Sequence, residues 1–418
     1  SAKFDRKNYP YPDLMKGYQI SQYDMPLSRG GWLEIEVEGQ QKRIGITRVH
    51  LEEDTARLLH RQDEAGEAYS LVDVNRSGVP LMEIVSEPDM RSPLEARQYL
   101  IKLRQLLQYL GVSAANMEEG NFRCDANVSI RPLGSDRFLG KVEIKNMNSF
   151  RAVYQALSYE VRRQVDVVAA GGRIAQETRG WVDEEERTVP QRSKEYAHDY
   201  RYFPDPDLPP LIISPQWVEE IKARMPELPD AKRERFLRQY GLSQYEVNLL
   251  TETRQRADYF EACLASAPSH DEERLRRRVK AVSNWMLGEM ARLLNATNSD
   301  IADSLVKPPH LAAMLDLLDQ GVITGKIAKT VFEEMFNTGR PPQQVVSEAS
   351  LVPISSADEL SAVVAKVIDA NPRAVGDYLA GKEEAVKFLL GQVMRETRGR
   401  ASPDLATNLL RKALSARR

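Results

Sequence analysis

The sequence is poor in cysteine and has no long hydrophobic run, and both shortages exclude classes of protein. Its 418 residues include only 2 cysteines, Cys124 and Cys263. Two distant cysteines cannot form a four-cysteine zinc site, and they fit a reducing compartment. No stretch approaches the roughly 18 consecutive apolar residues of a membrane-spanning helix. The first residues are charged and show no secretory signal, so we expect a cytoplasmic protein with no membrane partner.

The common motifs for nucleotide binding and nucleophilic catalysis are also absent. Neither Gly-x-x-x-x-Gly-Lys-Ser/Thr nor Gly-x-Gly-x-x-Gly occurs. Cys124 lies on the apolar side of a predicted strand, which favours a core residue over a thiolate nucleophile. The histidines show no metal-binding spacing, and we expect each to be structural or exposed: His50, His60, His198, His270 and His310. ATP, if it binds, therefore binds on a sheet, with carboxylates holding its metal ions.

The first half of the chain alternates apolar and polar residues in several short runs, which predicts β-strands. The runs lie at residues 33–37, 43–54, 122–131 and 138–145. Ser92 and Ser149 mark the starts of helices between and after these strands. In the second helix, apolar residues from Phe150 to Val168 recur at helical spacing. Strands mixed irregularly with helices predict an α+β fold with a mixed or antiparallel sheet rather than a doubly wound one.

A cluster of prolines between residues 204 and 210 marks a change to helical patterns alone. A chain of this length has room for two or three domains at roughly 100 to 200 residues each. We expect an α+β domain at residues 1–213, an all-α domain at 214–346 and a small helical tail at 347–418. Within the tail, Ser402 and Pro403 form a helix start.

The tail is basic, although the whole chain carries a net charge of -3. From Lys387 onward there are eight Lys or Arg residues and only two acidic residues, Glu396 and Asp404. Such a segment fits a surface that binds nucleic-acid phosphates, and it fits a solvated helix face about as well.

Two groups of acidic residues stand where an alternating strand would bury them. Glu52, Glu53 and Asp54 end the strand at residues 43–54, and Glu83 interrupts an apolar run at residues 79–85. A buried carboxylate without a cation is costly. The cation is either an arginine such as Arg48 or Arg76, or Mg²⁺, which binds one or two carboxylates together with substrate phosphates.

A row of polar side chains follows one face of the predicted strand at residues 122–131. The row consists of Arg123, Asp125, Asn127, Ser129 and Arg131. It is either a solvated sheet face or the floor of a substrate site, where guanidinium groups bind phosphate and Asp125 orients a ligand.

The segment after the next strand leads into a helix N-terminus. Lys145, Asn146 and Asn148 precede the cap Ser149, and free N–H groups at such a terminus suit an anion. Helix capping alone explains Ser149, but it does not explain Asn146 and Asn148. Residues 199–204 form an aromatic and basic loop that suits either base stacking or a packed domain junction.

These segments together resemble the B subunits of the glutamyl/aspartyl-tRNA amidotransferases. The matching segments are residues 4–9 (FDRKNY), 18–22 (YQISQ), 51–54 (LEED), 86–89 (SEPD), 117–120 (MEEG), 123–129 (RCDANVS) and 199–204 (DYRYFP). The likeness continues at 283–286 (SNWM), 325–329 (GKIAK) and 391–394 (GQVM). The resemblance thus covers essentially the whole chain.

The resemblance implies a fold and an activity. Residues 1–213 would form a cradle domain related to glutamine synthetase. The cradle would use ATP and Mg²⁺ to phosphorylate the side-chain carboxylate of Glu on tRNA(Gln) or Asp on tRNA(Asn), and ammonia would displace the phosphate. An amidase partner, the A subunit of the same complex, would supply ammonia through a channel, and a small C subunit would hold the pair together. A channel is needed because water would destroy an exposed acyl phosphate.

The resemblance assigns metal binding and the channel mouth to Glu53 and Glu83, with Glu52 as a neighbour, and places Lys7 and Lys16 on the ammonia path. Alternation alone does not choose between Glu52 and Glu53. We expect ATP and substrate to bind at Arg123, Asp125, Asn127, Glu143, Lys145 and Asn146. We expect tRNA to bind at Arg395, Arg398, Arg400, Arg411 and Lys412.

One departure from the family pattern concerns the metal site. The family begins with a segment resembling Val-Ile-Gly-Leu-Glu-Val-His, which adds a Glu and a His to that site, and this sequence starts after it. Two other functions compete with the kinase: a tRNA-binding scaffold without catalysis, and a ligase for free glutamate, which the basic tail disfavours.

Overall fold

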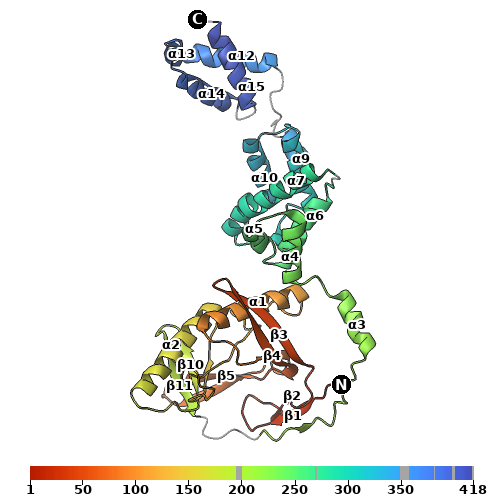
Figure 1. The fold of residues 1–418 in the computed structure, drawn as a ribbon, viewed down its shortest axis with the longest axis vertical. Helices are drawn as coiled ribbons and strands as arrows, with labels where there is room; N and C mark the ends of the chain where they lie inside the picture. Colours follow the sequence, from red (N-terminus) through yellow and green to blue (C-terminus); the bar gives the residue numbers. More distant parts are fainter. Residues whose placement is uncertain (194–199, 269–270, 349–356, 381, 398–400, 417–418) are drawn as a thin grey trace. The chain divides into compact units, whose positions relative to one another are not determined.

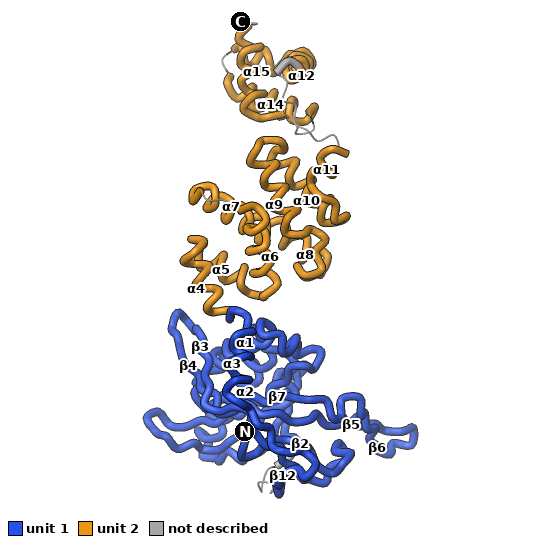
Figure 2. Tube along the Cα trace, turned by 90° about the vertical axis from the view of Figure 1, so that its right-hand side faces the viewer, with its two compact units in different colours: residues 1–228 blue, residues 229–418 orange. Residues whose placement is uncertain are grey.

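The computed structural model describes residues 1–193, 200–268, 271–348, 357–380, 382–397 and 401–416 (Figure 1). The chain forms two compact units, Ser1–Leu228 and Pro229–Arg418 (Figure 2). The first unit contains every strand that the structure describes, together with three helices, and the second contains only helices. The predicted α+β class is therefore confirmed. Among the described residues, no helix is long and apolar enough to cross a membrane.

A three-stranded antiparallel sheet carries the first predicted hairpin. It consists of β3 (Ser28–Val37), β4 (Gln40–Glu53) and β7 (Pro80–Ser86), in the order β3-β4-β7. Glu38 and Gly39 connect β3 to β4 with φ of 53° and 76°. Two positive φ angles in a two-residue loop match the right-handed twist of a hairpin, and glycine adopts them without steric cost. The hairpin predicted from the alternating sequence is confirmed.

The other strands form three smaller sheets. They are β1 (Asp5–Asn8), β2 (Tyr18–Ser21) and β12 (Phe203–Pro204); β5 (Arg57–Gln62) and β6 (Ala68–Asp73); and β8 (Ala126–Val128), β9 (Val142–Lys145), β10 (Glu177–Val182) and β11 (Arg187–Ser193). Strands β9 and β10 pair in parallel, and all other pairs are antiparallel. The strand predicted at residues 122–131 is shorter than expected, and its side chains alternate in exposure only from residue 122 to residue 128.

Two long helices begin at the caps that the sequence predicts. The hydroxyl groups of Ser92 and Ser149 accept N–H bonds from the first turns of α1 (Pro93–Leu110) and α2 (Phe150–Ala169). Helix α1 ends at Gly111, whose φ of 68° is left-handed. α1 packs on β3 and α2, while α2 packs on β8 and β11. The core between these helices and the sheets includes Leu33, Ile44, Tyr99, Leu103, Ile144 and Val153.

The buried face of α2 differs from its most obvious apolar stripe. Tyr154, Val165 and Val168 recur at helical spacing but are exposed. Glu160 and Gln164 are fully buried instead, together with small apolar residues of the same helix. Glu160 bonds to residues on other elements, and the amide of Gln164 donates to Glu160 and to the carbonyl of Val128, contacts that helical periodicity alone does not show.

Glu160 lies in a buried network that joins α2 to β10 and β11. Arg163 donates to Glu160 at 2.6 and 3.0 Å, and Thr188 donates to it at 2.9 Å. Arg179 lies 3.6 Å from Glu160 and 2.9 Å from Glu177. Arg179 also donates to the hydroxyl and the carbonyl of Thr188, both at 2.8 Å. These bonds satisfy a carboxylate that burial would otherwise make costly.

The remaining helices follow β12. They are α3 (Pro215–Arg224), α4 (Pro229–Tyr240), α5 (Gln244–Leu250), α6 (Arg254–Ala265), α7 (Glu272–Trp285), a π-helical turn (Met286–Met290), α8 (Ala291–Thr297), α9 (Pro308–Asp319), α10 (Gly325–Thr338), α11 (Pro342–Glu348), α12 (Ala357–Ala370), α13 (Pro372–Leu379), α14 (Glu384–Glu396) and α15 (Pro403–Ser415). Helix α15 begins at the predicted cap Ser402. The second unit holds two separate hydrophobic clusters, one within residues 236–346 and one within 360–414. The three-part division predicted from the sequence stays a prediction.

Glu246 gives the second unit a testable response to acid. Lys280 lies 2.6 Å from its carboxylate, and the hydroxyl of Ser243 donates to it at 2.7 Å. Burial would raise the pKa of Glu246, but the bonds from Lys280 and Ser243 outweigh burial and lower the pKa to about 2. A lowered pKa means that the ionised group stabilises the fold above its ordinary pKa of 4.5, and that this contribution disappears as the pH falls toward 2.

We therefore expect Glu246→Gln to destabilise the second unit at pH 6 by up to about 3 kcal/mol, from the shift in pKa. The difference from the wild type should shrink steadily between about pH 4.5 and 2. Urea unfolding followed by circular dichroism at several pH values measures it. Glu272→Gln, which removes an exposed acid on α7, is the control. A difference that stays constant down to pH 2 would contradict the prediction.

Candidate functional site

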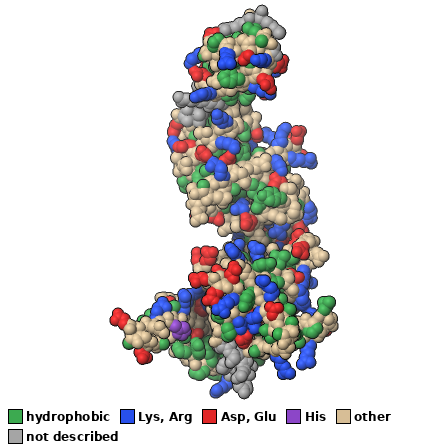
Figure 3. Space-filling view, turned by 90° about the vertical axis from the view of Figure 1, so that its left-hand side faces the viewer, with side chains coloured by type: hydrophobic (Ala, Val, Ile, Leu, Met, Phe, Trp, Pro, Cys, Tyr) green, Lys and Arg blue, Asp and Glu red, His purple; other side chains and the backbone are tan. Residues whose placement is uncertain are grey.

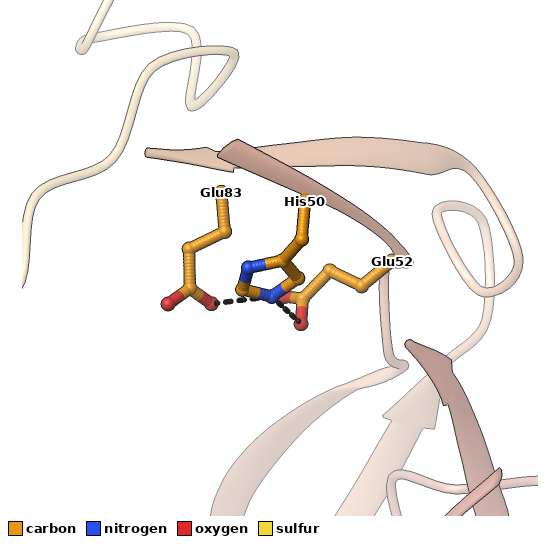
Figure 4. A group of neighbouring side chains, drawn as sticks. All are labelled: His50, Glu52 and Glu83. Atoms are coloured by element: carbon orange, nitrogen blue, oxygen red, sulfur yellow. Dashed lines mark ion pairs between the residues drawn. The ribbon is translucent and has the colours of Figure 1, made fainter. Parts of the chain in front are cut away.

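Strands β4 and β7 bring His50, Glu52 and Glu83 together on one face of their sheet (Figure 4). The register pairs His50 with Glu83, and strand alternation places Glu52 on the same face as His50. Nε2 of His50 lies 3.6 Å from a carboxylate oxygen of Glu52 and 3.6 Å from one of Glu83. His50 is buried, whereas the side chain of Glu83 is 48% exposed. The cluster is therefore accessible from solvent on one side.

The donor set of this cluster fits a hard divalent cation. Arg48 donates an N–H to Nδ1 of His50 at 3.3 Å, which leaves the proton of the neutral ring on Nε2. That proton faces both carboxylates. Mg²⁺ prefers oxygen ligands and takes one or two carboxylates. Glu52 and Glu83 therefore fit as ligands, and His50 lies between them. Among the described residues, this is the one group of three acidic, histidine or cysteine side chains close enough to share a metal ion.

Glu53 lies on the opposite face of β4 from Glu52. Its carboxylate pairs with Nζ of Lys16 at 2.6 Å and accepts the N–H of Ile20 at 2.9 Å. A pocket of about 180 Å³ opens beside it, lined in part by Asp13, Lys16 and Glu53. One carboxylate oxygen of Asp13 is buried without a hydrogen-bond partner. The structure thus joins two predicted site residues, Lys16 and Glu53, and separates Glu53 from Glu83.

The arginines considered as partners of Glu83 bind other groups. Arg48 contacts His50, and Arg76 pairs with Asp54 at 3.1 Å. Arg123, of the predicted polar row, also pairs with Asp54. Among the described residues, no arginine forms an ion pair with Glu83, so the alternative in which Glu83 is neutralised by an arginine is not supported.

Aromatic rings of residues 199–204 lie beside the acidic cluster. Tyr202 stacks on Tyr23 with ring centroids 4.4 Å apart and an interplanar angle of 12°. Burial raises the pKa of Tyr202 to about 12, and the charges of nearby groups that include Glu52 and Glu83 add to the effect. Lys7 lies over the ring of Tyr200, with Nζ 4.8 Å from its centroid. Asp199, in the same predicted loop, lies outside the described residues.

A second polar surface lies on β8 and β9. Asp125 and Asn127 are exposed, and Asn127 is paired with Glu143 in the sheet register. Lys145 forms ion pairs with Asp125 and, at 3.2 Å, with Glu143. Burial would lower the pKa of Lys145, but these carboxylates outweigh burial and raise it. Four predicted substrate residues therefore share one surface.

Asn146 extends this surface toward α2. It is exposed and has a φ of 65°, a left-handed conformation that asparagine tolerates better than most residues. A Cβ on Gly180 of β10 would lie 3.1 Å from the Asn146 amide. The hydroxyl of Ser149 is occupied as a helix cap, since it accepts the N–H of Ala152 at 3.0 Å.

The sequence predicts a core position for Cys124. It packs against the core of the first unit, and burial raises the pKa of its thiol to about 12. A thiol with such a pKa stays protonated at neutral pH. The preference for a core residue at this position is therefore supported.

The predicted tRNA-binding residues of the tail are partly described. Arg395 is exposed at the end of α14, and Arg411 and Lys412 are exposed on α15. Arg398 and Arg400 lie outside the described residues. Figure 3 shows Lys and Arg side chains interspersed with Asp and Glu on the face that it draws. The excess of positive charge is thus confined to the tail, because the whole chain carries a net charge of -3.

Sequence reasoning missed His50 as a member of the site. The signal was present, because His50 and Glu52 are two residues apart on a strand and must point to one face. What the sequence did not show was the register of β7, which brings Glu83 opposite His50.

Comparison with known proteins matches the chain almost throughout. Residues 1–219 match the family described as GatB/GatE catalytic domain, and residues 259–414 match the family described as GatB domain. A protein from Carboxydothermus hydrogenoformans, named as the B subunit of aspartyl/glutamyl-tRNA(Asn/Gln) amidotransferase, is 57% identical over 99% of this chain and 84% of its own length. Proteins of the same name from Dehalococcoides mccartyi (strain CBDB1) and Caldanaerobacter subterraneus are 54% and 53% identical over the same shares.

Proposed function

Because the chain belongs to the family of aspartyl/glutamyl-tRNA(Asn/Gln) amidotransferase B subunits, we propose that it activates the misacylated tRNA for amidation. The activation is an ATP-dependent phosphorylation of the side-chain carboxylate of Glu on tRNA(Gln) or Asp on tRNA(Asn). The chain is thus the kinase subunit of a ligase that acts in translation. The observation that carries this proposal is the cluster of His50, Glu52 and Glu83.

The acidic cluster holds the magnesium ion of Mg-ATP in this proposal. Glu52 and Glu83 would bind Mg²⁺, which when bound neutralises charge that develops on the transferred phosphate. His50 lies between the two carboxylates, with Nε2 3.6 Å from an oxygen of each. The exposed side of Glu83 leaves room for the phosphates. The stacked pair Tyr23 and Tyr202 lies near the cluster, since the charges of Glu52 and Glu83 act on Tyr202.

The polar surface of β8 and β9 binds the rest of ATP and the aminoacyl group. Asp125, Asn127 and Glu143 supply acceptors, and Lys145 supplies a positive charge toward phosphate. Residues 1–213 act as the cradle domain with a sheet related to that of glutamine synthetase. In this arrangement the site lies on sheet faces, as the absence of a phosphate-binding loop predicts.

The opposite face of β4 receives ammonia. Lys16 and Glu53 form an ion pair on that face beside a pocket of about 180 Å³, whereas Lys7, over the ring of Tyr200, lies on the side of the acidic cluster where the ammonia would arrive. These residues form the end of a channel from the amidase, the A subunit, with the small C subunit, which holds the pair together, as the third member of the complex. A channel keeps ammonia unprotonated and the acyl phosphate away from water.

One experiment tests the proposed function. The chain, together with the amidase and the small C subunit of its organism, is incubated with ATP, ammonium chloride and Glu-tRNA(Gln) or Asp-tRNA(Asn). We expect the amide form of at least one aminoacyl-tRNA, and none without ATP. Amidation that proceeds equally without ATP would contradict a kinase role.

The basic tail, residues 347–418, and the helical domain at 214–346 position the tRNA in this proposal. Arg395, Arg411 and Lys412 face solvent because the apolar residues of α15, such as Leu410 and Leu414, supply the packing. Contacts of this kind fix the position of the nucleic acid without reading its sequence.

We therefore expect Arg411→Ala together with Lys412→Ala to weaken binding of a tRNA(Gln) transcript several-fold at low salt. The slope of the logarithm of the binding constant against the logarithm of the salt concentration should become shallower by about 0.9 for each phosphate contact that is lost. Filter binding over a salt series measures both. The control is Lys222→Ala with Arg224→Ala, which removes two positive charges from α3. Equal losses in both double variants would show that net charge alone, and not the tail, determines the affinity.

A further inference from the structure

A hollow of about 590 Å³ opens on the outer surface of the β3–β4 hairpin, and the activation site does not use it. Trp32 and Arg43 lie at its wall, and residues that follow β7 complete it, including Asp89 and Arg91. The sheet register pairs Trp32 with Gly45 and Leu33 with Ile44. Ile44 points into the core, so Trp32 and Gly45 point away from it. The hollow therefore lies on the outward face of the hairpin.

The floor of the hollow is bare backbone. Gly30 has a φ of 69°, and a Cβ at this position would meet no atom within 4 Å. Gly31 would meet only a Cβ of Ile46, at 3.6 Å. Consecutive glycines inside a strand weaken it, and they are typical of places where a ligand or another chain approaches closely. Gly45 has a separate explanation, because its Cβ would lie 2.7 Å from the side chain of Glu87.

The turn after β7, residues 86–89, builds the side of the hollow. The N–H of Glu87 donates to the carbonyl of Gly45 at 2.8 Å, and the N–H of Gly45 donates to the carboxylate of Asp89 at 2.8 Å. The two acids are thus held by the backbone of β4 and by Thr47, which donates to Glu87 at 2.7 Å. This turn is one of the sequence segments shared with the family that the activation site leaves unexplained.

Two guanidinium groups at the hollow lack an acidic partner. Arg43 lies over the indole ring of Trp32, 3.8 Å from its centroid, and Arg91 donates to the backbone carbonyls of Pro88 and Met90. Among the described residues, no carboxylate forms an ion pair with either arginine. Trp32 remains 51% exposed although Arg43 covers part of it. The hollow therefore offers an open aromatic surface next to two arginines that form no ion pair, with Glu34 opposite Arg43 in the sheet register.

We propose that this hollow binds one unpaired nucleotide of the RNA substrate, an inference that rests on the proposed function. The base stacks on the open surface of Trp32, extending the Arg43–Trp32 pair, and a phosphate contacts Arg43 and Arg91. The bare backbone at Gly30 and Gly31 admits the sugar. The lining contains two arginines and one carboxylate, that of Asp89. This small excess of positive charge suits a single phosphate and not a duplex, which carries many.

Variants of Trp32 and Arg43 test this proposal in the whole chain. Binding of a tRNA(Gln) transcript is measured for Trp32→Ala, Trp32→Phe and Arg43→Ala. Arg187→Ala is the matched control, because Arg187 is exposed, lies in the same unit and pairs with Glu185 at 2.5 Å. We expect Trp32→Ala to raise Kd about fivefold or more, as loss of a stacked base does, and Trp32→Phe to keep most of the affinity.

The salt dependence supplies a second readout. Arg43→Ala should make the slope of affinity against salt shallower by roughly 0.7 to 0.9, the value for one phosphate contact, and Arg187→Ala should leave it unchanged. Wild-type affinity and slope in both Trp32→Ala and Arg43→Ala would overturn the proposal. Loss of assembly with the amidase and the small C subunit, with unchanged tRNA affinity, would also overturn it and assign the hollow to a protein partner. Neither result touches the proposed function, which ATP-dependent amidation by the wild type tests separately.

Discussion

Replacement of Glu52 or Glu83 by glutamine is expected to lower tRNA-dependent ATP hydrolysis by about 100-fold, the upper range for groups that support a metal site. Glutamine keeps the shape of the side chain but removes the negative charge that binds a hard cation. The pairing of β4 with β7 is unaffected, because it uses backbone groups. Binding of Mn²⁺ as a probe, measured by electron paramagnetic resonance, should be lost in parallel.

Glu53→Gln is the matched control for metal binding. Glu53 is next to Glu52 in the chain but points to the other face of β4, where it pairs with Lys16. We expect this variant to keep Mn²⁺ affinity while it impairs amidation with glutamine as the ammonia source. The resemblance to known B subunits favours Glu53 as a metal ligand. Loss of Mn²⁺ binding in Glu53→Gln, with normal binding in Glu52→Gln, would support that assignment and contradict the geometry described above.

Replacement of Arg179 by methionine is expected to destabilise the first unit by about 1 to 3 kcal/mol, because the bonds of its guanidinium to Thr188 and Glu177 are lost while Arg163 still pairs with Glu160. Arg179 bonds to Thr188 and lies close to Glu160 and Glu177. Methionine fills much of the same volume but offers no positive charge. Urea unfolding followed by the fluorescence of the buried Trp181 on β10 measures the change.

Arg187→Met provides the comparison for this prediction, because it removes a solvent-exposed pair with Glu185. Such pairs contribute roughly 0 to 1 kcal/mol. A double variant, Arg179→Met with Glu160→Gln, should be more stable than the sum of the single effects predicts, since the two residues share one network. Strictly additive changes in the free energy of unfolding, or equal losses of stability in Arg179→Met and Arg187→Met, would show that the network stabilises the fold no more than a surface ion pair does.

Local sequence patterns were sufficient for the hairpin and for the helix caps. Alternation before Gly39 predicted β3 and β4, and Ser92, Ser149 and Ser402 each cap the helix that was expected. These features depend on a few residues that are neighbours in the sequence, so they can be predicted without knowledge of the tertiary structure. The strand at residues 122–131 was predicted too long, because alternation continues where β9 no longer offers a partner.

Features that depend on distant partners were not predictable in this way. The apolar stripe of α2 suggested one face, but Glu160 is buried where Arg179 and Thr188 of other strands reach it, and Gln164 is buried where it bonds to Glu160 and to the carbonyl of Val128. The same limit applies to the site. Glu52 and Glu53 are equivalent in the sequence pattern, and only the positions of Glu83 and Lys16 distinguish them.

The most direct test of the kinase role is ATP hydrolysis by the assembled complex with Glu-tRNA(Gln), Asp-tRNA(Asn) or the same tRNAs without an amino acid. An enzyme that phosphorylates the amino-acid carboxylate should hydrolyse ATP much faster with a misacylated tRNA than with an uncharged one, and Glu83→Gln should abolish that stimulation. Hydrolysis that is independent of the amino acid, or that persists in Glu83→Gln, would contradict this account and favour a tRNA-binding scaffold.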